Sequence, residues 1–593
     1  MEYVFGGSET NQKKVLGHPS GLFVLFFTEM WERFSFYGMR VLLVNFLTMA
    51  ITGVDNPGWG WRAEQAGALF GTYAGLLYLT PLIGGVIADK FTGYKWAVVI
   101  GAAIMTLGHA SMALETEATM YIGLTLLVLG TGFFKPNMTS IISEMYKKAP
   151  QKKDGAFTIY YMGVNAGAFF GMMLCGYLAE TKGWAYGFGL AGIFMLFGTI
   201  QFWLSSPLFG EIGETPKKEK LTTQKNTANH STEKINPFTS IDKILIVICA
   251  LVGLLYLLDD PASKIANIHL LPSTLIGDYE NISGATQCII LALAAFLFLV
   301  ISRIIRYEKV VRDRMIALIV FAIFTIFFWM SFEQGATSLI IFARDYTQRE
   351  LIGNYAVVYN IINTLLTVIP LAIISWVLIL LYKQTHKLIK TSNVILIISF
   401  LVIWLIVGGM IYDQFKSETT VVTVSWFSTL NSFFIIALAS IFSKWWESKY
   451  NPTSAQKYSL GLILLGIGFA FLAFGANTIP SDAVAGTFRV SMIWLIFAYL
   501  FHTLGELCLS PVGLSQVSKL VPARMIGFMY GMWYLAIAIG NKVAGSLGGQ
   551  IEAITAKYDI STFFLIFTLV PIIAGIVIAL LNKTLVRKMH GID

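Results

Sequence analysis

Long apolar runs separated by short polar stretches cover almost the whole chain. About sixteen runs can be counted, most of them near the length of roughly 20 residues that a helix needs to cross a bilayer. They lie at about 21–53, 64–88, 95–114, 119–146, 155–180, 185–206, 243–258, 286–305, 313–343, 353–382, 392–413, 421–447, 457–478, 487–515, 524–551 and 560–583. The pattern predicts an all-α polytopic membrane protein.

Lysine and arginine residues gather on one side of these predicted spans. If every run crosses the membrane, about thirty of them share a side with the two termini and about eight fall on the other side. Because cytoplasmic loops are rich in these residues, we expect both termini in the cytoplasm and the chain in the cell inner (plasma) membrane. The net charge of +8 then reflects topology, and no nucleic-acid partner is expected.

Composition agrees with a membrane protein. The chain is 56% hydrophobic and 13% charged, against about 25% charged for a soluble domain. The polar first twenty residues show no cleavable signal peptide, so the first span is expected to direct insertion. Four scattered cysteines, without metal or redox spacing, are expected to be free thiols. Polar stretches at 210–242 and at about 259–285 predict a cytoplasmic linker and a loop on the opposite side.

The first span carries charged side chains where a membrane helix should have none. Residues four apart share a helix face, so Glu29, Arg33 and Tyr37 form one column, with Glu32 beside it. Each such charge costs roughly 2.5–3.5 kcal/mol at mid-membrane, although Glu29 and Arg33 can pair. The cluster is therefore interpreted either as a structural ion pair between helices or as the polar wall of a water-filled pathway.

Further polar residues interrupt later spans. Lys135 stands deep in an apolar run beside Pro136. Its side chain is interpreted either as paired with a carboxylate or as snorkelling to the membrane interface. Intramembrane carboxylates are functional candidates by default, whereas Trp, Tyr and Asn often only pack or join helices. The remaining candidates are Tyr161 with Asn165, Trp329 with Glu333, Glu506 with Ser510, and Trp533 and Tyr534 with Asn541.

Several motifs occur in a fixed order along the chain. They begin at Glu29 (E-x-x-E-R-F-x-x-Y-G), Gly130 (G-T-G-x-x-K-P-N), Tyr161 (Y-x-x-x-N-x-G), Trp329 (W-x-x-x-E-Q) and Gly505 (G-E-L-x-x-S-P-V-G). In this order they resemble the proton-dependent oligopeptide transporter family, and the stretch 84–95 resembles the loop motif of the major facilitator superfamily, to which that family belongs.

The resemblance implies two six-helix bundles around a central cavity that imports di- and tripeptides together with protons. It implies an N-terminal bundle at 1–209, the linker at 210–242, two additional helices at 243–305, a C-terminal bundle at 313–583 and a cytoplasmic tail at 584–593. We expect small peptides and the lipid bilayer as partners, a functional monomer, and no metal or cofactor other than the coupling protons.

The resemblance also implies roles for individual residues. Glu29, Glu32 and Arg33 match the proton-coupling residues, Lys135 works with them and faces the peptide carboxylate, and Glu506 meets the peptide amino group. Arg40 and Glu333 match an outer gate that protonation of the glutamate would release. The positions that match the substrate pocket are Arg33, Tyr37, Tyr78, Lys135, Asn165, Trp329, Asn431, Glu506, Ser510 and Trp533.

The chain departs from the family pattern in one region. Two extra apolar runs at about 353–413 predict an inserted two-helix hairpin, interpreted as a peripheral lipid-facing or contact element. The family's asparagine motif then matches Asn431, without the usual proline, or Asn363 inside the insertion; Asn431 is preferred because Lys457 and the run from Gly461 follow it as the family pattern expects.

Other functions compete with peptide import. The same fold can carry another small anion or a drug, also as an exchanger, and a receptor would bind peptides without moving them. An enzyme is disfavoured because the sequence shows no nucleophile–base pair and no metal spacing, while His109 and His502 stand alone.

Overall fold

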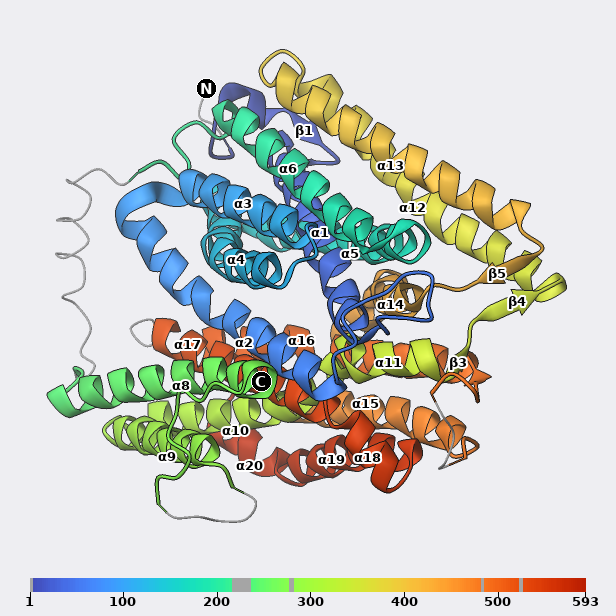
Figure 1. Cartoon of the computed structure of the whole chain (residues 1–593). Helices are drawn as coiled ribbons and strands as arrows, with labels where there is room; N and C mark the ends of the chain where they lie inside the picture. Colours follow the sequence, from blue (N-terminus) through green and yellow to red (C-terminus); the bar gives the residue numbers. More distant parts are fainter. Residues whose placement is uncertain (1–3, 216–235, 277–281, 481–484, 522–525, 593) are drawn as a thin grey trace.

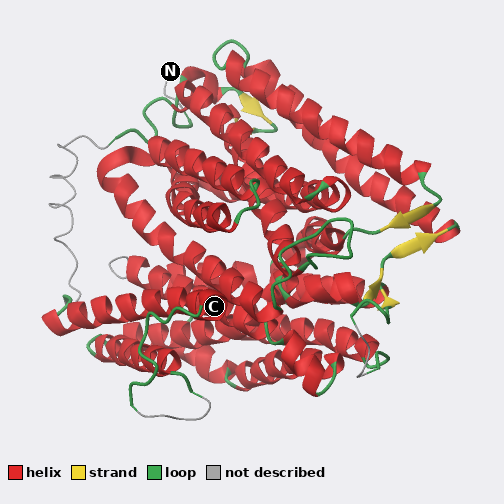
Figure 2. Ribbon diagram, in the orientation of Figure 1, coloured by secondary structure: helices red, strands yellow, loops and turns green. Residues whose placement is uncertain are grey.

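The computed structural model describes residues 4–215, 236–276, 282–480, 485–521 and 526–592, and these are almost entirely helical (Figures 1 and 2). Thirteen helical stretches of these residues are long and apolar enough to cross a membrane, and two of them, Ala63–Met112 and Lys309–Asp345, each contain two α-helices. The first six helices are α1 (Ser20–Thr48), α2 (Ala63–Ile87), α3 (Gly93–Met112), α4 (Glu117–Met145), α5 (Lys153–Lys182) and α6 (Trp184–Phe209).

The later helices complete the predicted set of spans. They are α8 (Ser240–Ala266), α9 (Gly284–Ile305), α10 (Lys309–Phe332), α11 (Ser338–Asp345), α12 (Asn354–Thr385), α13 (Lys390–Lys416), α14 (Val424–Trp446), α15 (Ser454–Ala476), α16 (Ile493–Leu520), α17 (Ile526–Gly548), α18 (Ile551–Lys557), α19 (Ile560–Leu580) and α20 (Asn582–Met589). The short strands are β1 (Lys14–Val15), β2 (His18–Pro19), β3 (Thr347–Gln348), β4 (Glu350–Ile352), β5 (Thr419–Val421) and β6 (Val490–Ser491). Strands β1–β2 and β4–β5 pair antiparallel, and β3–β6 pair parallel.

The helices form two halves. Helices α1–α6 pack on one another as the N-terminal half, and α10 packs with α14–α17 and α19 as the C-terminal half (Figure 1). We call the end of the spans where α1 ends and α2 begins the distal end, and the opposite end the proximal end. The predicted topology makes the distal end the outer one.

Two predicted spans differ in the structure. The run at 313–343 is not one helix, because a 3-10 turn at Glu333–Ala336 separates α10 from α11. The loop predicted to begin at 259 is wrong for residues 259–266, where α8 continues to Ala266 with Pro261 inside it. At both places charged side chains lie among packed helices. Sequence hydropathy had predicted an unbroken helix at the first place and a loop at the second.

The predicted boundaries are otherwise close to the helix ends. Helix α6 ends at Phe209, where the linker was predicted to begin, and α8 begins at Ser240; residues 216–235 of that predicted linker lie outside the described residues. The predicted tail overlaps α20, whose buried Leu585 and Met589 pack against the C-terminal half.

The α12–α13 hairpin belongs to the C-terminal half by sequence but packs on the N-terminal half. Helix α13 lies along α6 (Figure 1), and the Ser392 hydroxyl donates to the Gln201 carbonyl oxygen over 2.8 Å. The Phe400 ring lies 5.4 Å from Trp31 and 5.6 Å from Phe27, measured between ring centroids. The hairpin therefore crosses from one half to the other.

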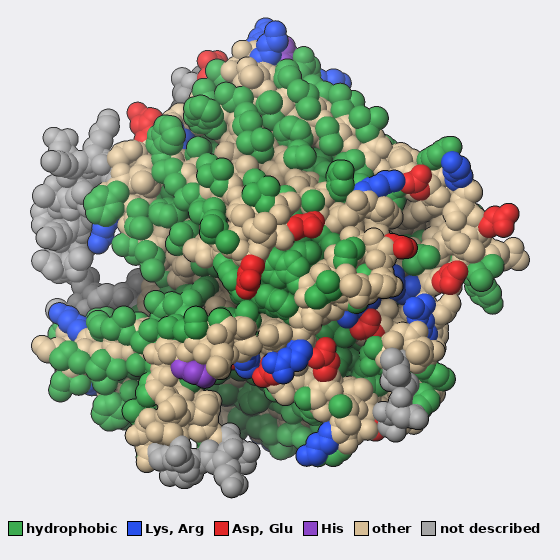
Figure 3. Space-filling view, in the orientation of Figure 1, with side chains coloured by type: hydrophobic (Ala, Val, Ile, Leu, Met, Phe, Trp, Pro, Cys, Tyr) green, Lys and Arg blue, Asp and Glu red, His purple; other side chains and the backbone are tan. Residues whose placement is uncertain are grey.

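The outer surface of the helices is apolar. Hydrophobic side chains cover much of the face seen in Figure 3, while charged side chains cluster mainly toward its right side and edges. The same view shows a recess on its left side, between the upper and lower halves. An apolar surface of this extent is what a chain surrounded by lipid requires.

Candidate functional site

The charged side chains of α1 form a cluster of ion pairs. The Arg33 Nε atom lies 2.8 Å from Glu29 Oε1 and 3.0 Å from Glu32 Oε2, while the Tyr160 hydroxyl of α5 donates to Glu29. Both carboxylates are almost completely buried, and the Arg33 side chain keeps 12% exposure. Two carboxylates thus share one cation, so one proton can be taken up without leaving the arginine unpaired.

Lys135 of α4 stands beside this cluster without joining it by an ion pair. Its Nζ atom lies 4.6 Å from the centroid of the Tyr78 ring of α2, a cation–π distance. Within the described residues no carboxylate lies within ion-pair distance of Lys135. The ammonium group is therefore available to a negatively charged ligand.

A carboxylate on the other half faces these cations. The Asn431 side-chain nitrogen of α14 donates to Glu506 Oε2 of α16 and to Thr503 Oγ1, both over 3.0 Å. Ser510 lies one turn further along α16, and no described group hydrogen-bonds its buried hydroxyl. Glu506 is thus held by a neutral amide and keeps its capacity to accept from a ligand.

The two halves are joined toward the distal end by a second ion pair. Arg40 of α1 pairs with Glu333 at the break between α10 and α11, and its guanidinium group lies 5.6 Å from the Tyr37 ring centroid. Glu333 is the first residue of the 3-10 turn and directly follows the last residue of α10. The turn between α10 and α11 therefore contributes a charge that bridges to the other half.

Aromatic residues line the seam between these charged groups. The Tyr78 ring lies 6.5 Å from that of Tyr534 of α17, so the two halves face each other here through tyrosines. Trp533, predicted for the pocket, is only 2% exposed and lies against Gly513 of α16, and partly buried Trp329 packs on Phe328 and Phe332 of its own helix. Tyr534 was noted in the sequence beside Trp533, but only Trp533 was expected in the substrate pocket.

The two candidate residues of α5 differ in how far their side chains are exposed. Asn165 is buried and its side-chain nitrogen donates to the Tyr161 carbonyl oxygen over 3.0 Å, a bond within the helix. Tyr161 keeps half of its surface exposed. The motif containing both residues was found in the sequence, but the exposed member of the pair is Tyr161.

The two candidate asparagines have different hydrogen-bond partners. Asn431 bonds to Glu506, as described above, whereas Asn363 of α12 accepts from the Trp426 indole nitrogen over 3.0 Å and donates to Gln414 over 3.3 Å. The geometry brings Asn431, and not Asn363, to the charged groups of the seam.

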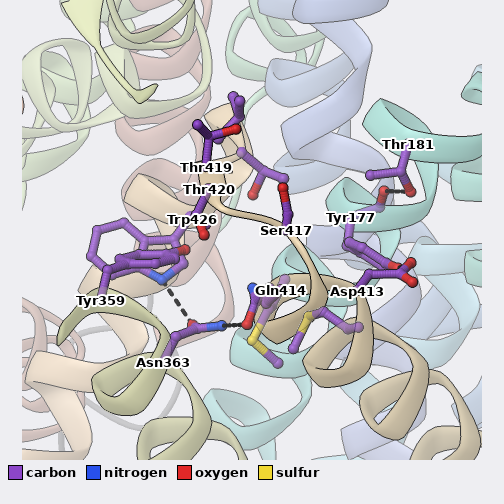
Figure 4. A pocket seen from close by; sticks show the side chains of 14 residues that line it. Tyr177, Thr181, Tyr359, Asn363, Asp413, Gln414, Ser417, Thr419, Thr420 and Trp426 are labelled. Carbon is purple, nitrogen blue, oxygen red and sulfur yellow. Dashed lines mark hydrogen bonds between the residues drawn. The ribbon is translucent and has the colours of Figure 1, made fainter. Parts of the chain in front are cut away.

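A cavity of about 190 Å³ lies away from these groups, at the distal base of the α12–α13 hairpin (Figure 4). It is lined by α5, α12, α13, α14 and the segment before α14. Its polar side chains bond mainly to one another, as in the Asn363–Trp426 and Tyr177–Asp413 hydrogen bonds. The cavity is therefore interpreted as the seat of the hairpin and not as part of the charged site.

The distal ends of the two halves are in close contact. A Cβ added at Gly67 of α2 would lie 2.3 Å from the Gly545 carbonyl oxygen of α17, so the two backbones touch without room for a methyl group. Glu180 of α5 accepts from the backbone nitrogen of Val424, over 2.8 Å, at the start of α14. Together with Arg40–Glu333, these contacts close the distal end of the seam.

Comparisons with known proteins agree on one family. A family model described as the POT family matches residues 95–403 and 403–566, two matches that meet inside α13. The peptide transporter YePEPT of Yersinia enterocolitica is 31% identical over 587 residues, which cover 97% of this chain and 96% of that protein. A di-/tripeptide transporter of Lactococcus lactis subsp. cremoris is 26% identical, with 98% of each protein covered. A crystal structure of a mutant of the peptide transporter POT with alafosfalin matches with a TM-score of 0.68 and 26% identity, covering 98% of each chain.

Proposed function

Because this chain belongs to the POT family and is a multi-span membrane transporter rather than an enzyme, we propose that it is a proton-coupled symporter that imports di- and tripeptides. The predicted family and the all-α major facilitator fold are confirmed. The peptide substrate, the coupling to protons and the inward direction of transport are the parts that we propose. The names of the relatives support the substrate, since they include peptide and di-/tripeptide transporters.

One observation carries the proposal: opposite charges face the seam from opposite halves. Arg33 and Lys135 come from the N-terminal half and Glu506 from the C-terminal half. A peptide zwitterion has a carboxylate that an arginine can grip with two hydrogen bonds and an ammonium group that a carboxylate can accept. Such a site binds the two ends of a short peptide and leaves its side chains loosely selected.

Proton coupling follows from the paired carboxylates. Protonating Glu333 removes the charge that holds Arg40, and a proton on Glu29 or Glu32 weakens the grip on Arg33. A proton on Glu333 therefore loosens a contact between the halves, whereas a proton on Glu29 or Glu32 acts within the N-terminal half and leaves Arg33 more available to the peptide carboxylate. With both termini in the cytoplasm, inward proton movement supplies about 2.3 kcal/mol per charge per 100 mV.

Uptake of labelled dialanine into proteoliposomes tests the proposal. We expect accumulation that requires an inward proton gradient and that other short peptides compete away. Binding without gradient-driven accumulation would favour a receptor or exchanger, and neither binding nor movement of dialanine would remove the peptide substrate and leave another small anion or a drug.

A variant tests the role given to Glu506. Glu506→Gln should abolish dialanine uptake, because the amide no longer carries the charge that meets the peptide amino group, while insertion and folding persist. Glu418→Gln, on an exposed residue before β5, is the matched control and should transport normally. Normal uptake by Glu506→Gln would contradict the role.

A further inference from the structure

Lys542 of α17 is a buried cation that the site described above does not include. Its side chain is 6% exposed and lies six residues from the distal end of α17, which is about 9 Å along a helix. A lysine at this depth requires a partner and is a functional candidate by default. Sequence reasoning missed it because a single Lys hardly lowers the hydropathy of the run at 524–551.

Three helices meet at the Lys542 ammonium group. It pairs with Asp260 of α8, donates to Thr72 Oγ1 of α2 over 3.0 Å and to the Ala68 carbonyl oxygen of α2 over 3.4 Å. One of these helices belongs to the N-terminal half, one to the C-terminal half, and α8 lies between the two halves in the sequence. The cation thus sits on the seam.

Helix α8 is attached to α2 beside this cation. Pro261 has no backbone N–H, so the Leu257 carbonyl oxygen loses its partner within α8, and the Thr72 hydroxyl of α2 donates to it over 2.7 Å. One turn further, Lys264 lies 3.5 Å from Glu64 of α2, and its carbonyl oxygen accepts from Gln65 over 3.2 Å. These bonds tie the distal part of α8 to the N-terminal half.

The backbones of the two halves also touch at the level of Lys542. A Cβ added at Gly71 of α2 would lie 2.9 Å from the Lys542 carbonyl oxygen, and one at Gly545 would lie 2.6 Å from the Gly71 Cα atom. The ammonium group is therefore enclosed whenever α2 and α17 are in contact. Its charge must be neutralised locally for the distal end to stay closed.

We propose that Asp260 and Lys542 form a second distal gate, through which the additional helix α8 takes part in the transport cycle. This rests on the proposed function as a transporter that opens alternately. Asp260 moves with α2 and the N-terminal half, while Lys542 moves with the C-terminal half, so distal opening separates them just as it separates Arg40 from Glu333. Both are positioning residues: they hold the seam and do not touch the substrate.

Distances between spin labels across the distal end test the gate. Labels on Ile51→Cys and Tyr558→Cys, exposed distal positions of the two halves, are measured in a background in which the four native cysteines are replaced. We expect Asp260→Asn to raise the ratio of long to short distances about ten-fold or more, because it leaves Lys542 enclosed without a counter-charge. Lys588→Gln, which breaks the Lys588–Asp313 pair within the C-terminal half, is the control and should leave the distances unchanged.

A double variant separates the gate from a general loss of stability. Asp260→Asn with Lys542→Gln removes both charges and should return the distances toward the parent protein, whereas additive opening would overturn the pairing. If Asp260→Asn does not fold, Thr72→Val is used instead; it keeps size and charge, removes both Thr72 hydrogen bonds and should open the distal end to a smaller degree.

The distances are measured without substrate, so they are independent of the peptide assignment. Unchanged distances in the folded Asp260→Asn protein would overturn the gate while gradient-driven dialanine uptake by the parent protein still supported the proposed function. Absence of dialanine uptake would overturn the peptide substrate while the distances still reported on the gate.

Discussion

The two helix pairs outside the six-helix halves are attached in different ways. The α8–α9 pair depends on buried charges: Asp242 of α8 and Arg303 of α9 lie 2.9 Å apart, are both almost completely buried and join the two helices to each other, while Asp260 pairs with Lys542 and joins α8 to the C-terminal half. The α12–α13 pair is held by aromatic packing at Phe400 and by hydrogen bonds such as Asn363–Trp426. Its contacts are mostly neutral.

This difference predicts that substitutions in the two helix pairs will lower the stability of the protein by different amounts. Breaking a buried ion pair leaves a charge without solvation and is strongly destabilising. Apolar helix contacts and single hydrogen bonds in a membrane are worth less, because lipid replaces the former and the latter average about 0.6 kcal/mol. We therefore expect α8–α9 to be fixed in register and position, and α12–α13 to be replaceable.

The largest effect is expected when an aspartate is replaced by asparagine in each of the two helix pairs and the losses of stability are compared. Asp242→Asn leaves the buried Arg303 without its counter-charge and should lower the free energy of unfolding by about 3 kcal/mol. Asp413→Asn, on the exposed carboxylate of α13 that accepts from Tyr177, should cost less than about 1 kcal/mol. Unfolding in micelles of increasing SDS content measures both, and equal losses would contradict the distinction.

Sequence hydropathy predicted the helices well because each span must present an apolar surface to lipid. It predicted the hairpin at 353–413 and found the charged column of α1 for the same reason: charges stand out against an apolar run. It failed at Glu333 and at Asp260. The break at Glu333 depends on tertiary contacts, such as the bond from Gln334 to the Ala544 carbonyl oxygen of α17, which hydropathy cannot express.

Asp260 shows why pairings are harder to predict than helices. Asp259, Asp260 and Pro261 follow an apolar run, and the polar stretch that begins there was predicted to be a loop. Here the proline frees a carbonyl oxygen that Thr72 satisfies, and the carboxylate has a partner in α17, far along the chain. Only the packing of α2, α8 and α17 reveals that the charges compensate one another.

A smaller effect is expected from excising the α12–α13 hairpin. Ile352 and Thr419 are already paired across β4–β5, so residues 353–418 can be replaced by a two-residue Asn-Gly turn. Lipid can cover Trp31 and Phe27 in place of Phe400, and we expect a lower melting temperature with dialanine uptake within an order of magnitude of the parent protein.

Excision also tests the view of the hairpin as a peripheral element. Reversing the order of two exposed residues in the same loop, Ser417 and Glu418, is the control for disturbance of the distal loop alone. A shortened protein that folds but no longer accumulates dialanine would show that the hairpin belongs to the transport machinery.

The smallest effect is expected at the seat of the hairpin. The Tyr177 hydroxyl of α5 donates to Asp413 over 2.6 Å and links the N-terminal half to α13 (Figure 4). Tyr177→Phe removes this bond and should lower the free energy of unfolding by about 0.6 kcal/mol. Combined with Asp413→Asn, the loss should be less than the sum of the two single losses, because both variants remove the same bond. A loss of several kcal/mol from Tyr177→Phe would mean that the hairpin, like α8–α9, is anchored by a polar contact that lipid cannot replace.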